Sequence, residues 1–265
     1  MISFLFWNVK RNPLQDRIAR LARTFNVDVL LLAECDMDRQ AMTASLSSES
    51  PMPFHFPAEQ PGKVLLWTRL PHTSVIPQYD DPTKWSIWQM NVGLHPGFLL
   101  AATHLPSKLY TESYDREEAA RSLAQAIART EDTVGHCRTI LVGDLNMNPF
   151  EYGVTGRVTL NAVMTRIIAQ RLHRVTNGEQ YRYFYNPMWG HFGDRTLGPA
   201  GTFYRSQSPF WNIYDQVLLR PGLADLLLDL RVLDHDGEES FLTAKGLPRR
   251  TDCSDYLPLL FQMNI

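Results

Sequence analysis

The sequence predicts an α/β fold in which two sheets pack face to face with helices outside. Short apolar runs of strand length recur through the chain and outnumber the amphipathic stretches of helical spacing. The strand-like runs occur in two batches, each mixed with helical stretches, which favours two sheets. No repeat, low-complexity segment or linker interrupts the pattern. We therefore expect one domain over residues 1–265.

The first 104 residues predict strands interrupted by two helices. Apolar Leu14, Ile18 and Leu21 at helical spacing predict a helix over Pro13–Phe25. The near-continuous apolar run Val27–Ala33 is typical of a strand buried on both faces. The other elements predicted here are a strand at Ile2–Trp7, a short helix at Met37–Leu46, and strands at Lys63–Thr68, Ser74–Pro77, Trp85–Val92 and Phe98–His104.

The remaining residues predict two helices and then a strand-rich third. The segment Ser113–Glu131 is charged early and alanine-rich later, as in a helix. Thr139–Gly143 reads as a strand that ends in a polar loop, Asp144–Glu151, and Thr159–Leu172 is predicted to be helical. The strands expected after it are Tyr183–Tyr185, Gly201–Tyr204, Tyr214–Leu219, Asp229–Leu233 and Leu257–Gln262.

Composition excludes several classes of protein. A net charge of −2 provides no overall field for a polyanion, so any contact with one must be local or mediated by a metal. The cysteines Cys35, Cys137 and Cys253 form no CxxC pair, which argues against a disulfide framework or a zinc site. The N-terminus lacks a basic region before its short apolar run, and no apolar stretch is long enough to span a bilayer. We expect a cytoplasmic protein without a membrane span.

Polar side chains that can bind a metal ion or a phosphate lie at the ends of five predicted strands. Carboxylate and carboxamide oxygens are the ligands that Mg²⁺ or Mn²⁺ prefers, and a histidine can act as an acid or a hydrogen-bond donor. Any one of these residues alone could simply begin a loop. The residues are Asn8, Glu34, His104, Asp144 with Asn146 two positions later, and Asp255 before the last strand.

The segment "ILVGDLNMNPFE" is the most specific of these strand ends. Asp144 and Asn146 are two residues apart, so in an extended segment their side chains point the same way. Such a pair could hold a metal-bound water or a phosphate. The alternative is an Asx-turn that closes the strand, because Asp and Asn favour turns. The residues alone leave both open.

Six segments in order along nearly the whole chain resemble the motifs of the endonuclease/exonuclease/phosphatase superfamily, which has the deoxyribonuclease I-like fold. They are "FWNVK", "LLLAECD", "ATHLPSK", "LVGDLNMNP", "YDQVLLR" and "CSDYLPL". The resemblance implies a four-layer α/β sandwich of two mostly antiparallel sheets flanked by helices. It also implies an enzyme that hydrolyses phosphodiesters or phosphomonoesters with Mg²⁺ or Mn²⁺.

The resemblance also implies a role for each matching residue. Glu34 would bind the metal, with help from Asn8 and Asp255. Asp144 would position or deprotonate the attacking water, and Asn146 and His104 would donate hydrogen bonds to the phosphoryl oxygens. Asp215, in "YDQVLLR", matches an orienting aspartate. Together these groups would neutralise the charge that builds on the phosphate during attack.

The last motif departs from the family, which has Ser-Asp-His where this chain has Ser-Asp-Tyr. Tyr256 is neutral at pH 7 and can donate one hydrogen bond, but it supplies no positive charge. Tyr256 could replace the histidine in a slower or differently tuned hydrolase, with Asp215 as a nearby acceptor. Another histidine, His191 or His235, could fill the space instead. The site could also bind phosphate without catalysis.

Arginines and aromatic residues suggest the substrate. Aromatic side chains crowd the third quarter of the chain, and "KGLPRRTD" precedes the last motif. Such groups stack on bases and bind phosphates, although aromatic core residues and a solvated loop would look the same. The substrate-binding residues we expect are Arg182, Arg205, Trp211, Arg249 and Arg250.

These features predict a metal-dependent nuclease that acts on DNA or RNA. Within the same superfamily, a phosphatase or phosphodiesterase for a nucleotide, an inositol phosphate or a phospholipid head group is the alternative. A non-catalytic phosphate- or nucleic-acid-binding module is the third hypothesis.

Overall fold

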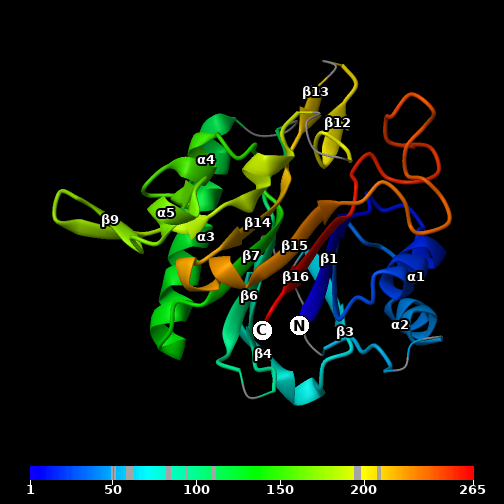
Figure 1. Ribbon diagram of the computed structural model, residues 1–265, viewed down its shortest axis with the longest axis horizontal. Helices are drawn as coiled ribbons and strands as arrows, with labels where there is room; N and C mark the ends of the chain where they lie inside the picture. The colour runs from blue at the N-terminus through cyan, green and yellow to red at the C-terminus, as the bar shows by residue number, and fades with distance from the viewer. Residues whose placement is uncertain are drawn as a thin grey trace.

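A computed structural model describes residues 1–48, 50, 52–57, 63–81, 85–93, 95–108, 112–193, 198–207 and 210–265. These residues form two large mixed sheets packed face to face, with helices on the outer side of each (Figure 1). The predicted α/β sandwich is therefore confirmed. Most strand pairs are antiparallel; the parallel ones are β1 with β2, β6 with β7, and β8 with β11.

The first sheet has the strand order β15-β16-β1-β2-β3 among the described residues. Its central strands join the two ends of the chain, since β1 and β16 pair antiparallel and the termini lie side by side (Figure 1). The strands are β1 (Ile2–Asn8), β2 (Val29–Ala33), β3 (Val64–Thr68), β15 (Leu227–Val232) and β16 (Leu259–Met263).

The second sheet has the order β4-β5-β6-β7-β14-β11-β8 in the described part of the chain. Its strands are β4 (Val75–Asp81), β5 (Trp85–Met90), β6 (Phe98–His104), β7 (Thr139–Asp144), β8 (Ala162–Val163), β11 (Phe184–Tyr185) and β14 (Asp215–Leu219). Two hairpins stand apart from the sheets: β9 (His173–Thr176) with β10 (Glu179–Arg182), and β12 (Phe203–Arg205) with β13 (Phe210–Asn212).

Helices cover the outer faces of both sheets. Figure 1 shows α1 and α2 beside the first sheet and α3, α4 and α5 beside the second. No helix among the described residues is long and apolar enough to cross a membrane. The helices are α1 (Gln15–Thr24), α2 (Arg39–Ser47), α3 (Ser113–Val134), α4 (Tyr152–Thr155) and α5 (Arg166–Ala169), with short 3₁₀ turns η1 (His72–Ser74), η2 (Pro187–His191) and η3 (Pro221–Leu226).

Aromatic side chains fill the space between the two sheets. Phe4 of β1 stacks on Phe261 of β16 with ring centroids 4.7 Å apart, and it meets the edge of Phe98 from the second sheet at 6.3 Å. A second apolar cluster lies between the second sheet and α3, around Leu123 and Leu141. Burial of these side chains holds the sheets and the helix layers at fixed positions.

The helix predicted at Thr159–Leu172 is wrong. The segment contains the short strand β8 and the single helical turn α5. Asn161 has a left-handed backbone (φ +51°), and its side chain donates to the carbonyls of Tyr181 and Arg182. Pairing of β8 with β11 replaces helical hydrogen bonds, so a tertiary contact overrides the local pattern.

Strand register brings the polar strand ends into one row. In the second sheet His104 lies opposite Asp144, and Asp144 lies opposite Asp215. The strands β6 and β7 approach so closely that a Cβ at Gly143 would lie 2.0 Å from the carbonyl oxygen of Thr103. Glycine is therefore needed directly before Asp144.

Candidate active site

Asn8 joins the functional ends of the two sheets. Its side-chain amide donates to Glu34 Oε1 and to Asp144 Oδ2, each at 3.1 Å. The backbone N–H of Lys10 donates to Asn8 Oδ1 at 3.0 Å, which sets the orientation of the amide. Because Asn8 is fully buried, these bonds fix the two carboxylates relative to one another.

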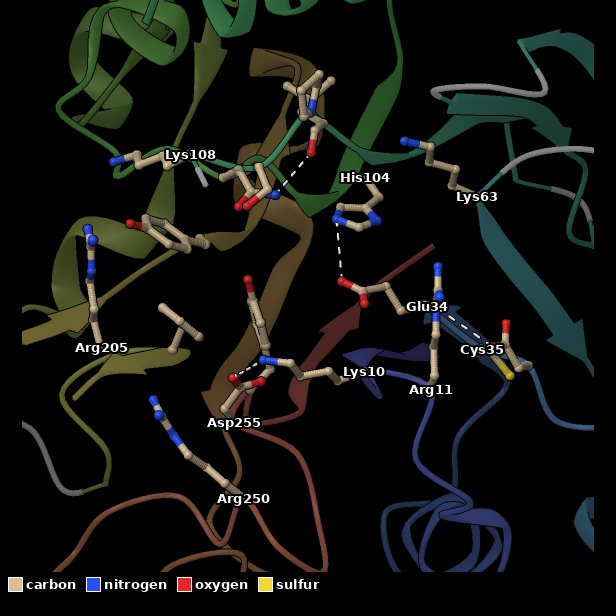
Figure 2. A pocket seen from close by; sticks show the side chains of 18 of the residues that line it. Lys10, Arg11, Glu34, Cys35, Lys63, His104, Lys108, Arg205, Arg250 and Asp255 are labelled. Carbon is tan, nitrogen blue, oxygen red and sulfur yellow. Dashed lines mark hydrogen bonds and ion pairs between the residues drawn. The ribbon is translucent and has the colours of Figure 1, made fainter. Parts of the chain in front are cut away.

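Glu34 follows β2 in a left-handed backbone conformation, with φ +48°. Such a conformation is unfavourable for glutamate and is found most often at functional sites. It turns the side chain toward the pocket, where the carboxylate stays partly exposed, with 29% of its side chain accessible (Figure 2). Glu34 is therefore available to a ligand from solvent.

His104 lies between the two carboxylates. Its Nε2 is 3.7 Å from Glu34 Oε1 and 3.7 Å from Asp144 Oδ2. Both distances are longer than those of hydrogen bonds. The ring also lines the pocket, so it can face both the carboxylates and a ligand.

Asp144 is fully buried at the end of β7. Burial raises the pKa of its carboxyl group, while the charge of His104 and hydrogen bonds from Asn146, Asn8 and Tyr256 lower it. The backbone N–H of Asn146 donates to Asp144 Oδ1 at 2.8 Å. The Asx-turn considered from the sequence is thus present, and it holds the carboxylate among its donors.

Asn146 has a left-handed backbone, φ +50°, and its amide donates to the carbonyl of Leu105 at 2.9 Å. Asparagine tolerates this conformation better than most residues. The residue lines the pocket, beside His104. Since one amide hydrogen is engaged with Leu105, the second remains for a ligand.

Asp215 lies behind the site at the start of β14. It is fully buried, and neither carboxylate oxygen accepts a hydrogen bond. Burial raises the pKa of Asp215 well above its ordinary value, and the charges of Asp144, Asp255 and Glu34 raise it further. Asp215 is therefore harder to ionise than an exposed aspartate.

Tyr256 lines the pocket directly after Asp255. Its backbone carbonyl accepts from the indole of Trp7 at 3.0 Å, and its ring packs on Phe203 with centroids 4.6 Å apart. Burial and the nearby charges of Asp144 and Asp215 raise the pKa of its hydroxyl well above 10. Tyr256 is therefore a neutral donor. His191 and His235 are not among the described residues that line the pocket.

A pocket of about 910 Å³ opens above these groups (Figure 2). Its floor is formed by Glu34, His104, Asn146, Asp255 and Tyr256. Cationic side chains from distant segments surround the floor. Those among the described lining residues are Lys10, Arg11, Arg39, Lys63, Lys108, Arg205 and Arg250.

Sequence reasoning selected Arg205 and Arg250 but missed the other lining cations. Lys10 and Lys108 stand within the segments "FWNVK" and "ATHLPSK", which were used only for their asparagine and histidine. Their closeness in sequence to Asn8 and His104 was the available signal. Arg39 and Lys63 had no such signal, because only the fold brings the start of α2 and the residue before β3 to the pocket.

Three residues expected to bind substrate do not line the pocket. Arg182 pairs with Glu131 at 3.1 Å and with Asp132 at 2.7 Å. Arg249 pairs with Asp252, and Trp211 meets Tyr204 edge to face across the hairpin of β12 and β13. The two arginines thus already have acidic partners, whereas Trp211 lies on a hairpin whose Arg205 does line the pocket.

The donor set suits a hard divalent cation. The described residues contain no group of three or more His, Cys, Asp or Glu side chains arranged to hold a metal. Mg²⁺, however, usually keeps several waters and binds through one or two carboxylates. Glu34 is accessible, and Asp255 has a buried Oδ1 without a hydrogen-bond partner. These two carboxylates fit such an ion.

Similar folds occur among enzymes that act on phosphate esters. A structure of D. rerio TDP2 complexed with single strand DNA product is 15% identical, with a TM-score of 0.57 and coverage of 100% of this chain and 99% of that one. An AP endonuclease from Archaeoglobus fulgidus is 13% identical, with a TM-score of 0.55 and both chains fully covered. ANGEL2, a 2',3'-cyclic phosphatase, is 15% identical, with a TM-score of 0.62 and coverage of 98% and 94%.

No curated protein sequence matches the chain. The model of the Endonuclease/Exonuclease/phosphatase family matches residues 5–232, which contain Asn8, Glu34, His104, Asp144 and Asp215. This match spans most of the sequence and agrees with the fold. The chain therefore belongs to the Endonuclease/Exonuclease/phosphatase family.

Proposed function

We propose that the protein is a metal-dependent phosphodiester hydrolase that cleaves nucleic acid. The cationic lining of the pocket carries this proposal. Figure 2 has Lys63 on one side of the floor and Arg205 and Arg250 on the opposite side. A chain of phosphates that crosses the floor would contact cations on both sides. The local positive charge also accounts for an anionic substrate in a chain of net charge −2.

The floor supplies the groups that hydrolysis requires. A divalent ion held by Glu34 and Asp255 would supply positive charge to the phosphate. Asp144 is held by Asn8 and Asn146 and has a pKa raised by burial, which makes its carboxylate a stronger base toward a water proton. His104 and Asn146 would donate to the phosphoryl oxygens, and the Tyr256 hydroxyl would turn from Asp144 to do the same.

The hairpin of β12 and β13 supports a polymeric substrate. Its strand β12 bridges to the last motif through Phe203 and Tyr256, so the hairpin is attached directly to the floor. Tyr204 and Trp211 form an aromatic pair on it, and Arg205 lines the pocket. Aromatic faces next to a basic edge bind single-stranded nucleic acid through stacking and phosphate contacts. The similarity to a fold solved with a single-stranded DNA product points the same way.

A small phosphate ester is the second candidate substrate. The pocket volume of about 910 Å³ lies within the range of small-molecule sites. One similar structure is a 2',3'-cyclic phosphatase. A nucleoside 2',3'-cyclic phosphate therefore belongs in the substrate panel.

The experiment incubates the protein with labelled single- and double-stranded DNA and RNA, and with a 2',3'-cyclic nucleotide, in Mg²⁺, Mn²⁺ or EDTA. We expect cleavage of a polymer that requires the metal and disappears in Glu34→Ala. Arg171→Met, at an exposed arginine that does not line the pocket, is the control and should cleave normally. Turnover of the cyclic nucleotide alone would replace the nuclease proposal with the second candidate. Failure to turn over any substrate would reject both.

A further inference from the structure

The floor of the pocket has more negative than positive charge. The carboxylates of Glu34 and Asp255 line the floor, the buried carboxylate of Asp144 shares the Asn8 amide with Glu34, and the hydroxyl of a tyrosine supplies no positive charge. A histidine at position 256 could carry a positive charge toward a bound phosphate, whereas tyrosine cannot. If the chain hydrolyses phosphate esters, as proposed above, another group must supply that charge beside the last motif.

Lys10 reaches this position from the other end of the chain. Its ammonium group forms an ion pair with Asp255, the residue directly before Tyr256 (Figure 2). The side chain of Lys10 is 53% exposed, whereas that of Asp255 is 6% exposed. The lysine therefore extends from the solvent side of the pocket down to the floor.

The backbone conformation around Lys10 directs this side chain toward Asp255. Lys10 and Arg11 are consecutive residues with left-handed backbones, φ +50° and +60°. Non-glycine residues adopt this conformation rarely, and two in succession require support from their surroundings. That support is present, since the N–H of Lys10 donates to Asn8 Oδ1 and the N–H of Arg11 donates to the carbonyl of Glu34 at 2.7 Å. The turn is thus fastened to Asn8 and Glu34.

Other lining cations interact with groups away from the last motif. Lys108 pairs with Glu151 at 2.5 Å and lies over the Tyr214 ring. Arg250 donates to Ser206 and to the carbonyl of Tyr204. Lys10 differs because its partner, Asp255, is itself part of the motif that lacks the histidine.

We propose that Lys10 is a catalytic residue that takes the place of the missing histidine charge. Its ammonium group moves from Asp255 to a non-bridging oxygen of the bound phosphate and remains protonated there. Asp255 becomes free for the divalent ion at the same time. The Tyr256 hydroxyl and the Lys10 ammonium together then provide the hydrogen bond and the positive charge that one histidine could give.

A double-mutant cycle tests whether Lys10 and position 256 perform one task. The variants are Lys10→Met, which keeps the length of the side chain, Lys10→Arg, which keeps the charge, Tyr256→His, and Lys10→Met combined with Tyr256→His. In the Tyr256 protein we expect Lys10→Met to lower kcat on the order of 10²-fold, as for loss of one charge-stabilising donor. Lys10→Arg should recover part of that loss. In the Tyr256→His protein, the factor by which Lys10→Met lowers kcat should be less than about a tenth as large. An equal loss in both backgrounds overturns the proposal.

Binding of inorganic phosphate provides a readout that does not depend on turnover. The protein is titrated with phosphate in Mg²⁺ by calorimetry, and Arg171→Met controls for the loss of one positive charge far from the pocket. We expect Lys10→Met to raise the Kd about tenfold or more and Arg171→Met to leave it unchanged. Equal affinity in Lys10→Met, or no phosphate binding by the wild type, overturns the proposal. Thermal melts of each variant establish that it is folded.

The two readouts separate this inference from the proposed function. If the wild type cleaves and Lys10→Met cleaves equally well, the hydrolase stands and the role of Lys10 fails. If the wild type cleaves no substrate, the hydrolase and the catalytic role of Lys10 both fail, and the phosphate titration shows only whether Lys10 binds the anion.

Discussion

The side-chain amide of Asn8 lies 3.1 Å from Asp144 Oδ2 and ties the end of β1 to the end of β7 in the opposite sheet. The same amide donates to Glu34, so one buried group orients two carboxylates with different proposed tasks. Asn8 was expected to help bind a metal. The geometry gives it a further role as the group that positions Glu34 and Asp144.

Replacing Asn8 with alanine removes both of these hydrogen bonds. We expect Asn8→Ala to lower kcat by about 10²-fold or more, because the carboxylates lose their fixed orientation. Loss of the buried partner should also lower the free energy of unfolding by about 1–3 kcal/mol. Steady-state kinetics and urea unfolding measure the two effects. An unchanged kcat in Asn8→Ala would show that the amide does not position the catalytic groups.

Removing the hydroxyl of Tyr256 tests its proposed hydrogen bond to phosphate. Tyr256→Phe keeps the ring that packs on Phe203. We expect kcat to fall on the order of 10²-fold while KM changes little, since the bond matters most when charge develops on the phosphate. If Tyr256→Phe retains full kcat, the hydroxyl takes no part in the reaction. The melting temperature serves as the control for packing.

Asp215 makes stability depend on pH in a defined direction. Its folded-state pKa is raised by burial above the unfolded value of about 3.9, so the folded state holds the proton more tightly. Its stabilising contribution is complete below that unfolded value and is lost as the pH rises through the folded-state pKa.

Asp215→Asn removes this ionisable group without changing its size. In EDTA we expect the variant to melt at a higher temperature than the wild type at pH 8, and the difference to shrink toward pH 4. Calorimetric scans across this range measure it. A difference that stays constant with pH would mean that Asp215 does not titrate in the way its burial implies.

Gly143 allows the close approach of β6 and β7. A Cβ at this position would lie 2.0 Å from the carbonyl oxygen of Thr103, so backbone would have to move. We expect Gly143→Ala to cost about 3 kcal/mol in the free energy of unfolding. Gly135→Ala is the matched control, because Gly135 also has positive φ but its Cβ would meet open space. Equal losses in the two variants would attribute the cost to backbone conformation alone.

Replacing Arg205 tests the cationic lining of the pocket. If a phosphate chain crosses the pocket, Arg205→Ala should weaken binding of single-stranded nucleic acid and reduce the slope of log K against log salt by about one unit. Fluorescence anisotropy at several salt concentrations measures the slope. Arg171→Ala, which removes a charge outside the pocket lining, should leave the slope unchanged. An unchanged slope in Arg205→Ala would mean that Arg205 does not contact phosphates.

Much of the strand framework could be predicted from local pattern, because buried strands such as β2 are continuous apolar runs. Predictions failed where tertiary contacts outweigh local preference. The segment 159–172 has residues compatible with a helix, but β8 pairs with β11 and Asn161 bonds to the carbonyls of Tyr181 and Arg182. The hairpin of β9 and β10 is largely polar and has no buried residue, so no apolar periodicity predicted it.

The sequence by itself determined the family and the polar residues at the strand ends, because both depend on short segments of consecutive residues. Only the tertiary structure decided which of these groups meet and what surrounds them. Lys10 and Asp255 are 245 residues apart, and they form an ion pair because β1 and β16 are neighbours in one sheet. The cationic lining of the pocket has the same origin, since its charges come from segments far apart in the sequence and no local pattern encodes their common position.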